Sequence, residues 1–533
     1  MKFGWQMLIL CFYVAAGWAL FDKCLDNPFV MDDENQITLN PFIQDIQFWP
    51  SYFTGSTMGA GGPKHLSGVY YKPLMTSYYA TIWHFFGSDP LAFRWPLLIL
   101  HILNAWMITL IFSSFLSRSF SVIAGTLFLV HPMNTEIVAY IANAQDSLYL
   151  FFGLLSLLIL NLSRLLNQRL TLFLISITLI LSLLSKETGA LFLVLTPLYA
   201  YLFYPVLFRK IMLSSLGIGV FYAGIRTYIG LTSFRNPTLK LHNVSILERW
   251  STIPDLTWHY FYEYFWGLKS SLNRDYVILS IDLANFWGPL LILMMIALFV
   301  LGLAKTSASD RESKIIIFFS ALLGTWFALH SHALIPLDGT VSDRWFYLGQ
   351  IGALGILGIV ASRMGRRSKL AEHAIHLVTL MLIALAIKQS WNRLELWSTP
   401  LKLYQADFAR FPDDSIMANN IGVEMFRARD LKGAKPYFEQ AILLNSKWAV
   451  PVNNLGAVEE GLGFRERAVD LYIKAMSIEP YGLAYENYAR NICSVPELEA
   501  VCRTFLVEKA LPLFPRNPKI VAIAKQLQID IPK

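Results

Sequence analysis

The chain has 533 residues, of which 55% are hydrophobic and only 15% are charged, and its mean hydropathy is +0.46. A soluble protein carries about a quarter charged residues, so this chain lacks the polar surface to face water everywhere. The formal net charge of +7 does not support nucleic-acid binding, because the basic residues along the apolar part of the chain collect in alternate short loops between apolar segments.

The first apolar segment, residues 3–21, follows Met1 and Lys2 and is long enough to cross a bilayer. A cleaved signal peptide is the alternative, but no small-x-small cleavage site follows the segment. We therefore expect a retained first membrane span.

The apolar segments of residues 1–390 predict a helical bundle of about eleven membrane spans. Their ranges are 3–21, 91–116, 120–131, 147–163, 170–185, 188–207, 211–230, 283–304, 315–335, 345–362 and 371–389. A further apolar segment, residues 70–86, is expected to be a half-inserted or interfacial helix. A full span there would reverse the orientation of every later loop.

Basic residues occur in alternate short loops, which the positive-inside rule assigns to the cytoplasm together with Lys2. They are Arg118, Arg164, Arg169, Arg209, Lys210, Lys305, Arg311, Lys314, Arg363, Arg366, Arg367 and Lys369. The other connecting segments, beginning with the first outer loop at 22–71, then lie outside. They hold nearly all of the unusual polar residues: Asp32, Asp33, Glu34, His131, Glu136, Asp146, Lys186, Glu187, Asp275, Asp343 and Arg344. Ionisable groups at membrane depth usually line a cavity or pathway, so we predict a site on this face.

The tail, residues 391–533, has ordinary soluble charge density and repeats with a period of 34 residues. The recurring pairs are Gly422 and Gly456, Ala434 and Ala468, Phe438 and Tyr472, Ala441 and Ala475, and Ser446 and Pro480. This pattern is typical of tetratricopeptide repeats, which stack as an α-solenoid. We predict that the tail binds a peptide or protein partner; a purely structural lid is the alternative.

Two features bear on the compartment of the tail. Cys493 and Cys502 form a disulfide if the tail is extracytoplasmic, or are two reduced packing cysteines. Asn243-Val244-Ser245 is a glycosylation sequon only in a eukaryotic host. We favour a bacterial plasma membrane with the repeats in the periplasm, or the endoplasmic reticulum membrane in a eukaryote.

Several motifs follow one another along the outer segments. They are Asp32-Asp33, Tyr71-Lys72-Pro73-Leu74, His131-Pro132-Met133-Asn134-Thr135-Glu136, Asp146, Ser185-Lys186-Glu187, Ser271-Leu272-Asn273-Arg274-Asp275-Tyr276, Val341-Ser342-Asp343-Arg344-Trp345-Phe346-Tyr347-Leu348 and Trp391 to Trp397. In this order they resemble the transmembrane and tetratricopeptide-repeat-containing O-mannosyltransferases, which are C-type (GT-C) glycosyltransferases that use polyprenyl-phosphate sugars. The family more often has Arg at Lys72, His at Asn134 and Glu at Asp343. These differences leave the sugar and the acceptor open.

The resemblance implies an inverting transfer of a sugar, expected to be mannose, from a polyprenyl-phosphate lipid to hydroxyl groups, expected to be those of protein Ser and Thr. It implies that Asp32 is the general base and that Asp33 orients the acceptor or the base. Preorganised cations stabilise a leaving phosphate. We expect this role for Lys186 and Arg344, with His131 and Lys72 behind them. Further site candidates are Glu34, Glu136, Asp146, Glu187, Asp275, Tyr276 and Asp343.

Simpler interpretations remain open for most of these residues. The acidic triplet Asp32–Glu34 is alternatively a solvated loop or a divalent-cation site. Lys186 with Glu187, and Asp343 with Arg344, are alternatively plain ion pairs. His131 alternatively only ends a span, and Asp275-Tyr276 only shapes a loop. For the whole protein, the alternatives are the same chemistry on a lipid or glycan acceptor, or a transporter or a non-enzymatic membrane scaffold.

Overall fold

The computed structural model describes residues 3–55, 57, 70–230, 240–267, 272, 274–337, 339–515 and 517–530. Lys2, which anchors the predicted orientation, lies outside these residues, as do Ser271 and Asn273 of one motif. The chain forms two compact units, Met1–Ser398 and Thr399–Lys533. The predicted domain boundary after residue 390 falls inside the last helix of the first unit.

All regular secondary structure in the described residues of the first unit is helical, apart from one isolated bridge between Arg274 and Val341. Its α-helices are α1 (Phe3–Phe21), α2 (Pro41–Gln44), α3 (Pro73–Phe86), α4 (Pro90–Phe112), α5 (Arg118–Val130), α6 (Thr135–Ala139), α7 (Ala144–Leu162), α8 (Gln168–Ser185), α9 (Phe192–Phe203), α10 (Pro205–Tyr228), α11 (Ile246–Trp266), α12 (Gly288–Lys305), α13 (Asp310–His330), α14 (Gly349–Gly365) and α15 (Lys369–Leu396). Short 3-10 or π turns connect them: η1 (Asp22–Cys24), η2 (Glu34–Thr38), η3 (Ile46–Phe53), η5 (Pro132–Asn134), η6 (Ile141–Asn143), η7 (Glu187–Leu191), η8 (Lys240–His242), η9 (Leu283–Trp287) and η10 (Asp343–Tyr347).

Among the described residues, eight helical segments are long and apolar enough to cross a membrane. A ninth is added if α5 and Pro132–Ala139, which are bent by 54° at their junction, form one broken span. The prediction of a multi-pass membrane protein is confirmed, but the count of eleven is not. The three predicted spans that are not among the eight, 120–131, 188–207 and 345–362, fall on helices of 13 residues (α5), 12 residues (α9) and 17 residues (α14). Length is therefore what separates the two counts.

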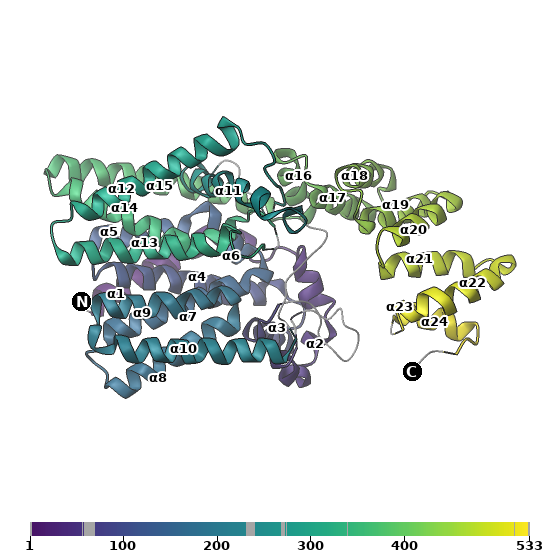
Figure 1. Ribbon diagram of the computed structural model, residues 1–533, viewed down its shortest axis with the longest axis horizontal. Helices are drawn as coiled ribbons and strands as arrows, with labels where there is room; N and C mark the ends of the chain where they lie inside the picture. The colour runs from purple at the N-terminus through teal and green to yellow at the C-terminus, as the bar shows by residue number, and fades with distance from the viewer. Residues whose placement is uncertain are drawn as a thin grey trace. The chain divides into compact units, whose positions relative to one another are not determined.

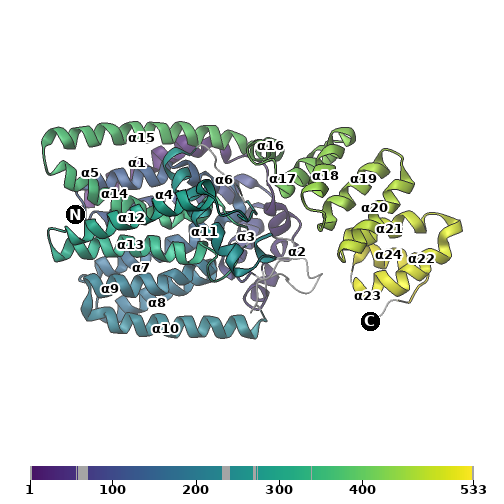
Figure 2. The same cartoon turned by 45° about the horizontal axis from the view of Figure 1, so that its top comes forward.

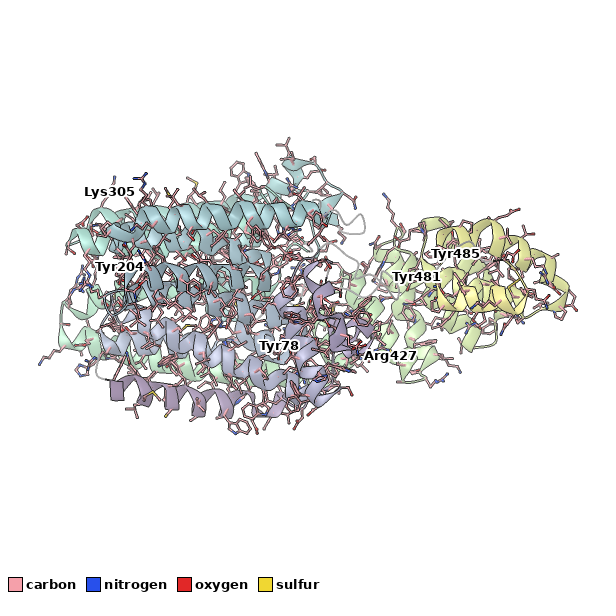
Figure 3. The ribbon with its side chains drawn as sticks, turned by 90° about the horizontal axis from the view of Figure 1, so that it is seen from below. Tyr78, Tyr204, Lys305, Arg427, Tyr481 and Tyr485 are labelled. Atoms are coloured by element: carbon pink, nitrogen blue, oxygen red, sulfur yellow. A yellow bond between two sulfur atoms is a disulfide. The ribbon has the colours of Figure 1, made fainter. Side chains whose placement is uncertain are left out.

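The bundle has tight turns at one end and long connections at the other (Figure 1). Ser117, Asn167, Ser309 and Ser368 each cap the helix that leaves a tight turn, through a side-chain oxygen that accepts a backbone N–H. Such caps satisfy donors that a helix start would otherwise leave free. Lys305 and Tyr204 mark this end in Figure 3, and Tyr78 lies toward the other. The basic residues of the predicted cytoplasmic loops all belong to the tight-turn end.

The segment predicted as a half-inserted helix forms α3, which has 14 residues and is not among the span candidates. It packs against α2, η3 and α8 at the long-connection end of the unit (Figure 2). Its N-cap is Lys72, and Pro73 occupies the first helical position, where a missing N–H costs nothing.

The second unit consists of helices in succession. They are α16 (Pro400–Arg410), α17 (Ser415–Arg427), α18 (Leu431–Leu444), α19 (Ala449–Gly461), α20 (Arg465–Ile478), α21 (Gly482–Cys493), η11 (Pro496–Leu498), α22 (Glu499–Phe505), η12 (Leu506–Ala510), α23 (Leu511–Leu513) and α24 (Pro518–Gln526). The starts of α17 and α18 recur after 34 residues in α19 and α20.

The two helix pairs are packed in the same way. A Cβ on Gly422 would lie 2.8 Å from the Phe438 ring, and one on Gly456 would lie 2.6 Å from the Tyr472 ring. Each pair therefore needs a glycine on its first helix to admit an aromatic ring from its second. A disulfide joins Cys493 to Cys502 across the start of α22, which decides between the two readings of these cysteines.

The predicted orientation can be measured with single reporter cysteines in a chain whose Cys11 and Cys24 are replaced by serine. An impermeant maleimide should label Leu39→Cys and Leu443→Cys on intact cells. It should label Arg311→Cys only after the cells are permeabilised, because the basic turns are retained inside. Cys493 and Cys502 remain bonded and provide an unlabelled background. Labelling of Arg311→Cys on intact cells would reverse the orientation.

Candidate functional site

Charged side chains from segments far apart in the sequence lie together at the long-connection end of the first unit. The segments are the loop after α1, the start of α3, the bend after α5, the start of α7, the end of α8, η10 and the end of α15. A membrane protein places charge at this depth at a cost, so each charge calls for a partner or a function.

The loop that carries Asp32 is held in a defined shape. Met31 has a φ of +52°, which is uncommon for a residue other than glycine. The buried Asp33 accepts the N–H of Val30 on Oδ2 at 3.1 Å and the N–H of Ala142 on Oδ1 at 2.7 Å. Both carboxylate oxygens of Asp33 are therefore used by the backbone, and its side chain holds the turn onto η6.

Asp32 differs from Asp33 in its exposure and in its side-chain partners. Its side chain is exposed, and it makes no hydrogen bond or ion pair to any residue that the structure describes. Its backbone N–H donates to the hydroxyl of the buried Tyr140 at 3.3 Å. Asp32 is thus a fixed but unpartnered carboxylate, as a general base must be before its substrate arrives.

Arg94, in α4, holds the preceding part of the same loop. It is fully buried and donates to the carbonyl oxygens of Leu25, Asn27 and Pro28, and to that of Ala139 at 2.9 Å. Burial raises the pKa of Asp33 to about 7, although Arg94 and the backbone donors act in the opposite direction. Arg94 and Asp33 together fix the loop from both sides.

Lys72 is a buried cation at the N-cap of α3. Its Nζ lies 4.0 Å from the centre of the Tyr70 ring, and it forms no ion pair with a described carboxylate. Burial lowers the pKa of Lys72 to about 8, against the attraction of Glu187, Asp146 and Asp32. The charged groups around Lys72 are therefore these three carboxylates and the ammonium group of Lys186.

Lys186 and Asp146 form an ion pair where two helix ends meet. Lys186 is the C-cap of α8 and Asp146 lies in the first turn of α7. Their Nζ and Oδ1 atoms are 2.7 Å apart. Helix C-termini favour cations and N-termini favour anions, so both helices support this arrangement. Lys186 is 13% exposed and Asp146 only 1%, so a ligand reaches the lysine first.

A network of four charged side chains lies beside this pair. Glu136 binds Arg344 through Oε2 at 3.4 Å and Arg393 through Oε1 at 3.0 Å. Arg393 also binds Asp343, with Nη1 and Oδ2 2.7 Å apart. Glu136 and Asp343 are completely buried, whereas Arg344 is 16% exposed. The network therefore ends in one accessible guanidinium.

Arg344 faces the same region as Asp32. Burial disfavours its charge, but the acidic groups around it, Glu136 foremost, outweigh burial and raise the pKa of Arg344. Asp146 and Asp32 are among those groups. Asp32, Lys72, Lys186 and Arg344 consequently share one electrostatic environment.

The simple ion pairs considered from the sequence do not form. Lys186 binds Asp146 rather than Glu187, and Asp343 binds Arg393 rather than Arg344. Glu187 binds Arg226 at 3.1 Å and accepts the N–H of Tyr71 at 3.1 Å. Each of these charges therefore links separate segments of the chain.

Other predicted residues have structural partners. His131 uses Nε2 with the carbonyl oxygen of Tyr264 at 2.9 Å, and its Nδ1 accepts the N–H of Met133. Its ring stacks on Tyr264, so no nitrogen of His131 is left for a phosphate.

Asp275 and Tyr276 belong to the long outer segment. Asp275 accepts the N–H of Lys240 at 2.6 Å, and the hydroxyl of Tyr276 donates to Asp255 at 2.7 Å. These contacts shape the segment, and they do not bring the two residues into contact with the cluster around Asp32.

The acidic triplet does not form a metal site. Across the described ranges, no group of three or more His, Cys, Asp or Glu side chains is placed to hold a metal ion. Both oxygens of Asp33 already accept backbone N–H groups, and Glu34 starts η2.

Sequence reasoning missed Arg94, Arg393 and Tyr140. Arg94 lies inside the long apolar helix α4, where an ionisable residue is itself a signal of a buried partner. Arg393 lies in the last turn of α15, where the sequence is polar and gives no such signal. Arg393 lies within the predicted Trp391–Trp397 motif, but Asp343 and Glu136, which it binds, lie 50 and 257 positions earlier in the chain.

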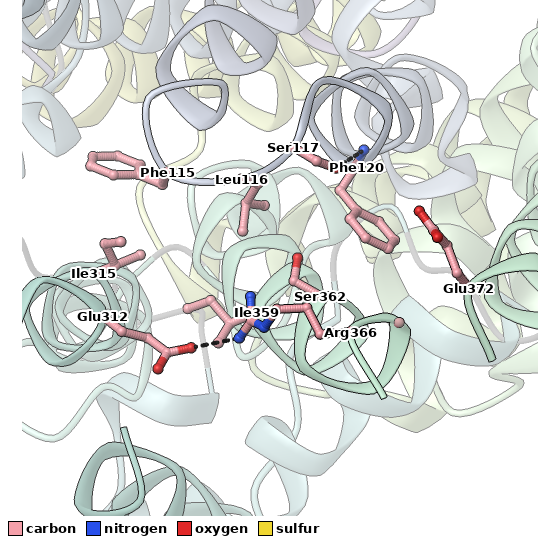
Figure 4. A pocket seen from close by; sticks show the side chains of 11 residues that line it. Phe115, Leu116, Ser117, Phe120, Glu312, Ile315, Ile359, Ser362, Arg366 and Glu372 are labelled. Atoms are coloured by element: carbon pink, nitrogen blue, oxygen red, sulfur yellow. Dashed lines mark hydrogen bonds and ion pairs between the residues drawn. The ribbon is translucent and has the colours of Figure 1, made fainter. Parts of the chain in front are cut away.

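A cavity of about 330 Å³ lies at the opposite, tight-turn end of the unit (Figure 4). It lies among the ends of α4 and α14 and the starts of α5, α13 and α15. Its charged lining includes Glu312, which binds Arg366 at 3.3 Å and Arg363 at 3.1 Å. Since the cations there are already paired, the cavity lacks the reactive groups that gather around Asp32.

Comparisons with known proteins identify only distant similarity. No family model matches the chain, and no curated protein matches it. Among solved structures, the chain is similar to ArnT from Cupriavidus metallidurans bound to undecaprenyl phosphate, with 14% identity and a TM-score of 0.40 over 99% of this chain and 90% of that one. The apo structure of the same ArnT gives 15% identity and a TM-score of 0.39 over 99% and 89%. Similarity at this level does not establish a shared fold or substrate.

Replacing Arg393 by glutamine should destabilise the first unit by about 3 kcal/mol or more, because Asp343 and Glu136 would lose a buried counter-charge. The matched control is Lys314→Gln, which breaks an exposed ion pair with Asp310 and should cost less than about 1 kcal/mol. Thermal unfolding of the full chain in detergent measures both. Equal melting temperatures for the two variants would show that the network contributes nothing.

Proposed function

We propose that the chain is a glycosyltransferase that moves a sugar from a polyprenyl-phosphate donor to hydroxyl groups on the extracytoplasmic face of the membrane. The observation that carries the proposal is one unpartnered, exposed carboxylate, Asp32, beside three accessible or unpaired cations, Lys72, Lys186 and Arg344. A carboxylate and a cationic pocket are the two parts that transfer from a sugar phosphate requires.

The cations suit a lipid-linked phosphate. As the anomeric C–O bond breaks, negative charge gathers on the departing phosphate oxygen, and fixed positive charges stabilise it in a low-dielectric site. Arg344 offers a planar fork for two oxygens, and Lys72 and Lys186 act as point charges. A membrane-end location also suits a donor whose phosphate is attached to a polyprenyl chain.

In the proposed reaction, the acceptor hydroxyl oxygen attacks the anomeric carbon from the side opposite the phosphate, so that the configuration is inverted. Asp32 takes the hydroxyl proton, and the polyprenyl phosphate leaves with the bonding electron pair. Asp33 acts as a positioning residue for Asp32, because its two oxygens hold the turn that presents the base. His131 supports the bend behind the arginine network.

The resemblance to O-mannosyltransferases supports mannose as the sugar and protein Ser or Thr as the acceptor. The 34-residue recurrence of the second unit supports tetratricopeptide repeats that dock a polypeptide. The Cys493–Cys502 disulfide supports an oxidising compartment, such as a periplasm or an endoplasmic reticulum lumen, for that unit. Transfer to a lipid or glycan acceptor is the alternative outcome of the assays below.

Asp32→Asn should lower kcat for sugar transfer by about 100-fold or more while donor binding changes little, because general-base catalysis is worth about 10² to 10⁴. The control is Asp26→Asn, which changes an exposed carboxylate of the same loop. The assay follows labelled mannose from polyprenyl-phosphate mannose to a Ser/Thr peptide and, separately, to lipid acceptors. Full activity of Asp32→Asn with the protein correctly expressed would remove Asp32 as the base.

Lys72 should impose a pH dependence on donor capture. Because its pKa is lowered to about 8, its positive charge is present below that pH and is lost above it. The kcat/KM for the donor should therefore fall as the pH rises from about 7 to about 9, since this quantity reports the free enzyme. In Lys72→Arg the alkaline fall should disappear, because arginine remains protonated throughout.

Lys72→Met provides the complementary measurement. It should lower kcat/KM about tenfold at neutral pH, as expected for loss of a charge-assisted contact, and should also remove the alkaline fall. An unchanged alkaline limb in both variants would mean that Lys72 does not contact the donor.

A further inference from the structure

The cavity at the tight-turn end of the first unit has a charged mouth and an apolar floor (Figure 4). Its volume of about 330 Å³ falls within the range of about 300–1,000 Å³ that is typical of ligand pockets. Three of its apolar lining side chains are buried: Phe120, Ile315 and Ile359. Two of its charged lining side chains, Arg366 and Glu372, are exposed. The lining therefore changes from charged to apolar with depth, as a phospholipid does from its headgroup to its chains.

Arg366 is the cation of the mouth, and only part of its guanidinium is used. It is the C-cap of α14, and its side chain is 62% exposed. Its Nη2 donates to Oε1 of Glu312 at 3.3 Å, and no described residue accepts from its Nε or Nη1. A guanidinium has five N–H donors in a planar fork. Arg366 thus has donors left for phosphate oxygens while it keeps its contact with Glu312.

Glu312 does not need Arg366 for its compensation. It accepts Nε of Arg363 on Oε1 at 3.1 Å and the N–H of Ala308 on Oε2 at 2.8 Å. Arg363 also donates to the hydroxyl of Thr306 and to the carbonyl oxygen of Leu303, so all three of its nitrogens are used. The Glu312–Arg363 pair is therefore structural, and Arg366 is the cation that a ligand can reach.

Glu372 places a negative charge at the same mouth. It lies in the first turn of α15, is exposed, and forms no hydrogen bond or ion pair with a described residue. Figure 4 shows its carboxylate apart from the Glu312–Arg366 pair. A carboxylate is also favoured there by the helix dipole, but that interaction leaves its oxygens open to a ligand. The mouth consequently offers a donor for an anion and an acceptor for a cation.

We propose that this cavity binds a phospholipid whose headgroup carries a primary amine, such as phosphatidylethanolamine, from the membrane leaflet at this end of the bundle. Arg366 donates to the phosphate oxygens, and the ammonium group donates to Glu372. The apolar floor covers the first methylene groups of an acyl chain. Both polar contacts join charged groups, and such hydrogen bonds are about twice as strong as those between neutral groups.

The two carboxylates of the lining determine which headgroup fits. Glu312 and Glu372 would repel a headgroup of net negative charge, because like charges placed side by side are destabilising. A choline headgroup has no N–H to donate to Glu372. A primary amine meets both requirements. This binding is independent of the proposed sugar transfer, because the cavity lies at the opposite end of the unit from Asp32.

The experiment titrates phosphatidylethanolamine, phosphatidylcholine and phosphatidylglycerol, all with the same acyl chains, into the purified full chain in detergent. Native mass spectrometry counts the bound lipid. The Kd for phosphatidylethanolamine should be at least fivefold lower than the other two, as expected for one additional charge-assisted hydrogen bond. Glycerophosphoethanolamine, which has the headgroup without chains, should bind at least tenfold more weakly than the lipid.

Two substitutions separate the phosphate contact from the amine contact. Arg366→Gln should raise the Kd for phosphatidylethanolamine about tenfold. Its control is Arg367→Gln, which changes the next residue, an exposed arginine outside the lining. Glu372→Gln should raise the Kd for phosphatidylethanolamine about fivefold, to that of phosphatidylcholine, and should leave phosphatidylcholine binding unchanged. Its control is Asp310→Asn, an exposed carboxylate at the start of α13 that is also outside the lining.

Equal binding of the three lipids would identify only unspecific contact with the membrane and would overturn the proposal. Tightest binding of phosphatidylglycerol, or unchanged binding by the Arg366→Gln chain, would also overturn it. If glycerophosphoethanolamine bound as tightly as the lipid, the ligand would be a soluble phosphate ester and not a membrane lipid. Glu372 is exposed and has no ion pair, so Glu372→Gln remains decisive if Arg366→Gln lowers the melting temperature.

Discussion

The charges at the long-connection end of the first unit depend on one buried carboxylate, Glu136, held between two arginines. An isolated ion in an apolar bundle would be neutralised or would draw in water, so each buried charge must be paired. Glu136 pairs with Arg393 and Arg344, and Arg393 in turn neutralises Asp343. Because three of these four groups are enclosed, Arg344 becomes a rigidly placed cation with a free side. Removing the network would leave the carbonyl oxygen of Leu272, which accepts from Arg344 at 3.0 Å, as the remaining hydrogen-bond partner of the guanidinium among the described residues.

Because most charges at this end are paired, the charged residues without an ion pair point to a site that binds a substrate. Asp32 and Lys72 come from different segments, lie in one electrostatic environment and have no ion pair among the described side chains. Nothing in the packing of the bundle requires either charge, whereas Arg94 and Asp33 hold the loop that carries Asp32. Structural charges thus surround a smaller set that has no ion pair among the described side chains. In the proposed reaction, an acceptor that gives up a proton and a donor that releases a phosphate would complete that set.

Much of this arrangement could be read from the sequence, and the rest could not for definite reasons. Long apolar runs and alternating basic loops predict the helices and bring the outer polar residues to one end, because both follow from local composition. Pairing does not. Lys186 with Glu187 and Asp343 with Arg344 are neighbours in sequence, yet helix ends turn them toward Asp146 and Arg393 instead.

The compartment of the second unit and the chemistry of the first constrain each other. Basic turns at one end of the bundle and a disulfide in residues 399–533 are independent features, one set by retention of positive charge and the other by redox potential. The basic turns predict that the opposite end of the bundle, with Asp32, faces away from the cytoplasm, and the disulfide is typical of an oxidising compartment for the second unit. Nucleotide sugars are made in the cytoplasm, so a transferase acting on that side needs its sugar carried across by a lipid. A site rich in cations at the membrane end of a helical bundle is what a lipid phosphate would require.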